Sequence, residues 1–131
     1  MMKKSICIID DDSLYKLLLI KSINKLNMEV QINCFANGRE GYDSIYKDLN
    51  TAENLPDIIF LDINMPEMDG WEFMDEFIQI QKSLSKKITI YIVSSSIAFQ
   101  DTEKANRYKE ISGYIIKPFQ ADCLKKILSD V

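Results

Sequence analysis

Five short apolar runs, separated by amphipathic stretches, constrain the fold of this 131-residue chain more than any other feature of its sequence. The apolar runs predict strands at residues 5–9, 29–35, 58–61, 88–93 and 114–116. The stretches between and after them predict helices at residues 13–26, 37–49, 69–80, 98–109 and 121–128. Strict alternation of strands and helices requires a parallel sheet covered on both faces and joined by right-handed crossovers. We therefore predict a single doubly wound α/β domain over residues 1–131, with a five-stranded parallel sheet and five helices.

Two of these elements carry patterns that indicate how they are buried. Residues 29–35 alternate between apolar and polar side chains, which predicts a half-exposed strand near the edge of the sheet. In the helix predicted at 13–26, six apolar residues recur at roughly helical spacing with lysines between them: Leu14, Leu17, Leu18, Ile20, Ile23 and Leu26. We expect an amphipathic helix whose apolar face includes these residues.

The composition excludes several classes of function. The formal net charge is −4 and there are only two arginines, so broad binding to nucleic-acid phosphates is a poor hypothesis. The absence of histidine excludes Ser-His-Asp catalysis, Cys-His catalysis and histidine-ligated zinc within this chain. No stretch approaches the ~20 apolar residues of a membrane span. We therefore expect neither nucleic acid nor a membrane among its partners.

Three cysteines, Cys7, Cys34 and Cys123, lie far apart and form no CxxC motif. This spacing offers neither a zinc ribbon nor a redox motif. The first apolar run is too short for the core of a signal peptide and lacks a small-residue cleavage site. We expect buried, reduced thiols in a cytoplasmic protein.

Polar or charged residues stand where four of the five predicted strands end. Asp10 and Asp11 follow the first strand, and Asp62 follows the third. Ser94 follows the fourth strand and Lys117 the fifth. Ligands of open parallel sheets bind outside the carboxyl ends of the strands. We therefore expect these five residues to converge on one edge of the sheet.

The three carboxylates of Asp10, Asp11 and Asp62 need a partner. Two carboxylates ~4 Å apart repel by about 4 kcal/mol at an effective dielectric constant of about 20. Such a cluster requires a cation or raised pKa values, and hard carboxylate oxygens suit Mg²⁺. Lys117 and Ser94 add an ammonium and a hydroxyl that can bind phosphoryl oxygens. Together these groups predict a phosphoryl-transfer site with a carboxylate as the nucleophile.

Four segments at strand ends follow one another in an order typical of a known family. They are Ile8–Asp12, Leu61–Gly70, Ile92–Ser95 and Gly113–Phe119. The sequence resembles the receiver domain of two-component response regulators, and the resemblance covers essentially the whole chain. It implies a flavodoxin-like fold with the strand order 2-1-3-4-5, in a stand-alone receiver like those of chemotaxis.

The resemblance also implies a phospho-acceptor and a metal site. Asp62 would accept the phosphoryl group. The side chains of Asp11 and Asp62 would ligate Mg²⁺, or Mn²⁺ in its place, together with the backbone carbonyl of Asn64. Asp10 would contact the metal ion through water.

A switch is implied on the other side of the site. Ser94 and Lys117 would bind the phosphoryl group, and Ser94 would be drawn toward it. Tyr114 matches the aromatic residue that swings inward when the hydroxyl residue moves, which reshapes the face formed by the fourth helix, fifth strand and fifth helix. The peptide bond before Pro118 is often cis in this family.

Partners follow from the missing histidine and from the family. The phosphoryl donor must be another molecule, either a sensor histidine kinase or a histidine phosphotransfer protein. The sequence stops directly after the last predicted helix, so we expect output through contact with a downstream protein. We expect no enzymatic activity beyond self-phosphorylation and autodephosphorylation at Asp62, and a monomer or weak dimer.

Other readings of the same residues are weaker. A Mg²⁺-dependent phosphatase with an aspartyl nucleophile typically needs a second acid two residues later, where this chain has Asn64. A flavin- or nucleotide-binding domain would need a phosphate-binding loop after the first strand, where three aspartates stand instead. A receiver that acts without phosphorylation is disfavoured by the intact acids, hydroxyl and lysine.

Overall fold

The computed structural model describes residues 3–130, so both predicted domain limits, residues 1 and 131, lie outside the described residues. The strands are β1 (Lys4–Ile9), β2 (Val30–Phe35), β3 (Ile58–Leu61), β4 (Thr89–Ser94) and β5 (Ile111–Ile116). The α-helices are α1 (Ser13–Asn24), α2 (Gly38–Lys47), α3 (Gly70–Ile80), α4 (Phe99–Asn106) and α5 (Ala121–Asp130). Two short 3-10 helices, Ala52–Asn54 and Gln81–Ser83, lie in the connections.

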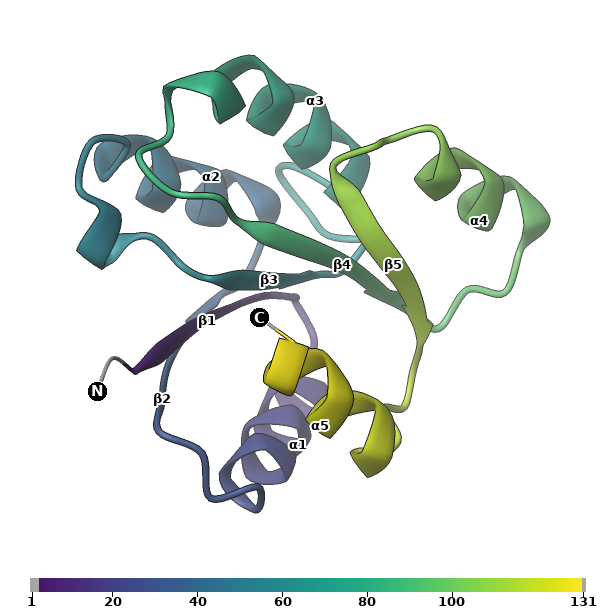
Figure 1. The fold of residues 1–131 in the computed structure, drawn as a ribbon. Coiled ribbons are helices and arrows are strands. Elements are labelled where there is room, and N and C mark those ends of the chain that lie inside the picture. The colour runs from purple at the N-terminus through teal and green to yellow at the C-terminus, as the bar shows by residue number, and fades with distance from the viewer. Residues whose placement is uncertain (1–2, 131) are drawn as a thin grey trace.

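All neighbouring strands of the sheet pair in parallel, in the order β2-β1-β3-β4-β5. Helices α1 and α5 cover one face, while α2, α3 and α4 lie on the other (Figure 1). The doubly wound fold and strand order expected from the sequence are confirmed. The element ends differ by up to three residues, as at β5, which begins at Ile111, and at α4, which ends at Asn106.

The central strands are buried on both faces because their side chains alternate between two cores. In β3, Ile59 and Leu61 pack into the core under α2 and α3, whereas Ile58 and Phe60 pack into the core under α1 and α5. Strand β2 lies at the edge of the sheet and is only half-buried, as its alternating sequence predicts.

Side-chain caps fix where α1, α2 and α3 begin, and those of α1 and α3 lie beside strand ends. The carboxylate of Asp12 accepts a hydrogen bond of 3.0 Å from the backbone N–H of Tyr15 at the start of α1. Asp69 and Glu72 form a reciprocal capping box at the start of α3. Gly70 packs so tightly that a Cβ would collide with the carbonyl oxygen of Asp62. The start of α3 is thereby held against the end of β3.

The predicted apolar face of the first helix is right for Ile23, which is buried, and for Ile20 and Leu26, which are partly buried against the core. It is wrong for Leu14, Leu17 and Leu18, which are exposed at 66%, 48% and 53%, whereas Leu19 is buried in their place. Apolar residues occur on most sides of this helix, so their spacing did not determine which side faces the sheet.

The prediction of buried cysteines holds for one residue and fails for two. Cys7 is buried in the centre of β1, but Cys34 and Cys123 are exposed. Cys34 lies near the end of the edge strand β2, and Cys123 lies in the first turn of α5.

No helix in the described part of the chain is long and apolar enough to cross a membrane.

Candidate functional site

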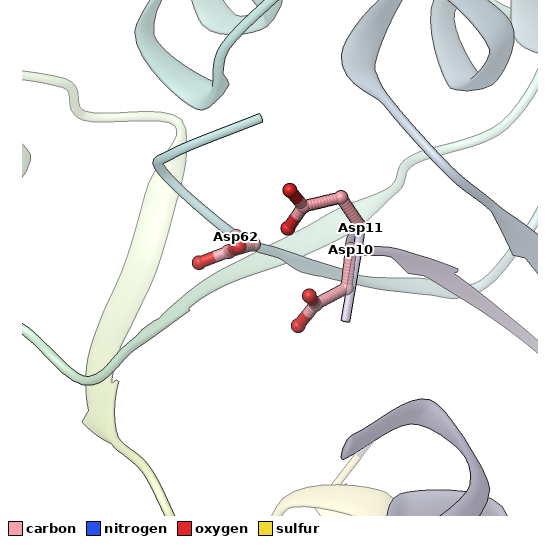
Figure 2. A group of neighbouring side chains, drawn as sticks. All are labelled: Asp10, Asp11 and Asp62. Carbon is pink, nitrogen blue, oxygen red and sulfur yellow. The ribbon is translucent and has the colours of Figure 1, made fainter. Parts of the chain in front are cut away.

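The ends of β1 and β3 bring three carboxylates together. Ile9 pairs with Leu61 in the parallel register, so the residues that follow each strand are neighbours. Asp10, Asp11 and Asp62 each place one carboxylate oxygen within 4.8 Å of the others (Figure 2). Asp10 and Asp62 are buried, whereas Asp11 is exposed. The cluster predicted from the sequence is therefore present, with one side open to solvent.

Lys117, just beyond the end of β5, balances part of this negative charge. Its Nζ lies 2.8 Å from Asp10 Oδ2 and 3.8 Å from Asp62 Oδ1. The side chain of Lys117 is 14% exposed, and its backbone N–H donates to the carbonyl oxygen of Ser94. The following Lys117–Pro118 peptide bond is cis, as the family resemblance implied.

The electrostatics of Asp62 differ from those of an ordinary carboxyl group. Burial is the largest cause and raises the pKa of Asp62 to about 7, and the charge of Asp10 acts in the same direction. Lys117 and a backbone hydrogen bond of 2.9 Å from the N–H of Ile63 act in the opposite direction. Without a cation, the three carboxylates thus favour retention of a proton near neutral pH.

Ser94 and Tyr114 are linked through the loop between β4 and α4. The Oγ of Ser94 is buried and accepts a 3.0 Å hydrogen bond from the backbone N–H of Ser96. The hydroxyl of Tyr114 donates to the carbonyl oxygen of Ser96 at 2.9 Å. The side chain of Ser96 donates to Asp101 of α4 at 2.7 Å. One loop residue therefore connects the predicted switch pair to helix α4.

Asn64, a predicted metal ligand through its backbone carbonyl, lies in the loop after β3, two residues beyond Asp62. Its side chain is exposed and has no acidic proton to donate.

Tyr15 was missed by the sequence analysis. Its ring centroid lies 4.2 Å from Lys117 Nζ, which is within the range of a cation–π interaction. The available signal was its position in the first turn of the predicted helix, shortly after the acidic residues that follow the first strand.

Comparisons with known proteins identify a family that has this fold. The family model of the response regulator receiver domain matches residues 6–129. The chain belongs to the response regulator receiver family. It is 31% identical over 130 residues to the chemotaxis protein CheY of Thermotoga maritima, covering 99% of this chain and 98% of that protein. A two-component response regulator from Cytophaga hutchinsonii has a crystal structure that superposes with a TM-score of 0.85, at 29% identity, covering 99% of this chain and 97% of that one.

Receiver domains also occur within longer proteins. This chain is 34% identical over 98 residues to a protein-glutamate methylesterase/protein-glutamine glutaminase of Leptospira interrogans. The match covers 75% of this chain but only 25% of that protein. The comparisons therefore establish a receiver of two-component signal transduction, and the methylesterase activity belongs to the longer relative.

Proposed function

We propose that Asp62 accepts a phosphoryl group from a phosphohistidine on another protein and that this change alters a protein-binding face of the receiver. The observation that carries the proposal is the convergence of three carboxylates and the Lys117 ammonium at one edge of the sheet. The donor would be a sensor histidine kinase or a histidine phosphotransfer protein. A cytoplasmic location and a monomeric or weakly dimeric state stay predictions from the sequence.

The donor atoms at this edge suit a divalent cation. Carboxylate oxygens of Asp10, Asp11 and Asp62 are hard ligands close to one another, and burial, followed by the charge of Asp10, raises the pKa of Asp62. Asp11, Asp62 and the backbone carbonyl of Asn64 would hold Mg²⁺ or Mn²⁺ directly, and Asp10 would hold it through water. When bound, the ion neutralises negative charge on the carboxylates and on the transferring phosphoryl group.

The transfer is a substitution at phosphorus. An ionised oxygen of Asp62 forms the new P–O bond while the P–N bond to the donor histidine breaks. The electron pair of that bond stays on the histidine nitrogen, which then binds a proton from solvent. The ammonium of Lys117 is near enough to Asp62 to pair with a phosphoryl oxygen. Ser94 uses its oxygen as an acceptor in the structure, which leaves its hydroxyl proton available to the phosphoryl group.

Phosphorylation would reach the surface through Ser96. A phosphoryl group adds about −1.5 to −2 charges beside Ser94. Movement of Ser94 toward that charge would disturb its hydrogen bond with Ser96, whose other bonds hold Tyr114 and helix α4. The face built by α4, β5 and α5 would therefore change, and a downstream protein would distinguish the two states.

The proposal is tested with a small phosphodonor. Incubation with Mg²⁺ and phosphoramidate should increase the intact mass by about 80 Da, as expected for one phosphoryl group. Asp62→Asn should abolish the increase. Asp12→Asn is a matched control because Asp12 is exposed, and asparagine caps helices as well as aspartate does. Labelling that persists in Asp62→Asn and maps to another residue would overturn the assignment.

A phosphate-release assay with phosphomonoesters separates a regulator from a phosphatase. We propose that the receiver's only chemistry is its own phosphorylation and dephosphorylation at Asp62. Sustained release of phosphate from a range of phosphomonoesters would instead favour the phosphatase.

A further inference from the structure

We propose that Tyr15 is a positioning residue whose aromatic ring holds the Lys117 ammonium within reach of Asp62. This inference rests on the proposed function, because it assigns a role in phosphoryl transfer at the same site. It adds a residue of helix α1 to a site otherwise built from strand ends.

The surroundings of the ammonium carry the argument. Lys117 Nζ lies 2.8 Å from a carboxylate oxygen of Asp10 and 4.2 Å from the centroid of the Tyr15 ring. An ammonium on a flexible four-carbon stem has many rotamers, so a single ion pair would hold it loosely. The ring supplies a second attraction and covers part of the ammonium. These two contacts therefore hold Lys117 Nζ in a position 3.8 Å from Asp62 Oδ1.

Tyr15 is itself held firmly enough to do this. Its backbone lies in the first turn of α1, where its N–H is bound by the Asp12 cap. Its ring stacks on Phe119 with the centroids 6.4 Å apart and the planes 18° apart. Phe119 in turn packs edge-on against Phe60 of the buried strand β3, at 5.3 Å. A continuous set of aromatic contacts thus connects the ring over Lys117 to the centre of the sheet.

The ring, rather than the hydroxyl, accounts for the contact with Lys117. The Tyr15 hydroxyl oxygen is buried and has no hydrogen-bond partner among residues 3–130. Burial, together with the charges of Asp10 and Asp62, raises the pKa of this hydroxyl, so the group is neutral. A phenylalanine would keep the π face and lose only the unpaired hydroxyl. A leucine would fill much of the same space without attracting a cation.

The test compares Tyr15→Phe with Tyr15→Leu by the rate of phosphorylation with phosphoramidate at saturating Mg²⁺. We expect Tyr15→Phe to react within about twofold of the unmodified protein and Tyr15→Leu about five- to tenfold more slowly, as suits a partly desolvated cation–π contact. Tyr15→Met is a second apolar variant without a π face and should behave like Tyr15→Leu. Circular dichroism and thermal unfolding establish that each variant is folded.

Two further measurements separate positioning from packing. In a Lys117→Ala background, Tyr15→Leu should cause little additional loss, because its effect acts through the missing ammonium. In the unphosphorylated protein, the NMR signals of the Lys117 ε-methylene should carry a ring-current shift that Tyr15→Phe preserves and Tyr15→Leu removes. The NMR measurement needs no phosphoryl transfer, so it tests the contact even if Asp62 is not the acceptor.

Three results would overturn the role of Tyr15. The first is a Tyr15→Leu variant that reacts as fast as the unmodified protein. The second is a Tyr15→Phe variant as slow as Tyr15→Leu, since the hydroxyl would then be the active group. The third is a loss from Tyr15→Leu that is as large without Lys117 as with it, since Tyr15 would then act by packing alone.

Discussion

Replacing Asp62 by asparagine should stabilise the metal-free protein above neutral pH. The folded chain holds the Asp62 carboxylate in a buried position beside Asp10 and Asp11. The substitution removes one of three neighbouring negative charges and keeps an oxygen to accept the hydrogen bond from Ile63. Lys117 keeps its closer partner, Asp10, at 2.8 Å. The substitution therefore loses little attraction to Lys117. It relieves the repulsion between Asp62 and the neighbouring carboxylates and the cost of burying the Asp62 charge.

The size of the effect follows from the pKa of Asp62. The difference between a pKa of about 7 in the folded protein and 3.8 in an unfolded chain corresponds to about 4 kcal/mol. The open side of the cluster at Asp11 admits water, whose screening lowers the gain to about 2 kcal/mol. In a domain of this length, such a gain raises the midpoint of thermal unfolding by about 7 °C.

The dependence on pH has a definite sign. A carboxyl group with a higher pKa in the folded state binds its proton more tightly there, so the unmodified protein loses stability as the pH rises from about 4 to about 7. Asparagine has no proton to lose. The stability advantage of Asp62→Asn should therefore be full at about pH 8 and smaller at about pH 5.

Urea unfolding of both proteins in EDTA, at the two pH values, measures this difference. Asp43→Asn is the control, because it removes a carboxylate from an exposed ion pair on α2 and should change stability by less than about 1 kcal/mol. Mg²⁺ at about one hundred times its dissociation constant should add about 2.7 kcal/mol to the unmodified protein and less to Asp62→Asn. Equal stability of the two proteins at about pH 8 in EDTA, or an advantage no smaller at about pH 5, would refute this account of the carboxylate cluster.

Three other changes test how the fold supports the site. Gly70→Ala should destabilise the protein by about 1–3 kcal/mol in urea unfolding, because its Cβ meets the backbone of Asp62, which cannot move aside like a side chain; unchanged stability would contradict that packing. Tyr114→Phe removes the hydroxyl that donates to Ser96 and should cost about 0.5–1.5 kcal/mol in the unphosphorylated protein, whereas a variant as stable as the parent would show that the bond contributes nothing. In a titration with a thiol reagent, Cys34 and Cys123 should react in the folded protein and Cys7 only after unfolding, since burial raises the pKa of the Cys7 thiol and blocks access to it; rapid reaction of Cys7 in the folded state would contradict the structure.

The sequence predicted the site better than it predicted the surface of the helices. Asp10, Asp62 and Lys117 could be placed together because parallel topology alone brings strand ends to one edge. The side of α1 that faces the sheet could not be predicted in this way. Leu17, Leu18 and Leu19 are consecutive, so hydrophobicity does not single out the buried one, and the packing of the whole helix against β1 and β3 decides it.

Contacts between side chains far apart in the chain could not be predicted from the sequence either, because they also depend on how the elements pack. The stacking of Tyr15 on Phe119 depends on how α1 sits against the loop between β5 and α5. The hydrogen bonds of Ser96 depend on the path of the loop between β4 and α4. The local sequence around Tyr15 or Ser96 determines neither arrangement.

The stability prediction and the chemistry of Asp62 have the same origin. A nucleophilic carboxylate must be ionised, yet the burial and the neighbouring charges that define this site raise the pKa of Asp62 to about 7. Near neutral pH and without a cation, a substantial fraction of Asp62 would thus be protonated and unreactive. A divalent cation between the carboxylates would lower that pKa and restore the nucleophile. The burial and repulsion that destabilise the metal-free fold would therefore also make phosphorylation of Asp62 depend on the cation.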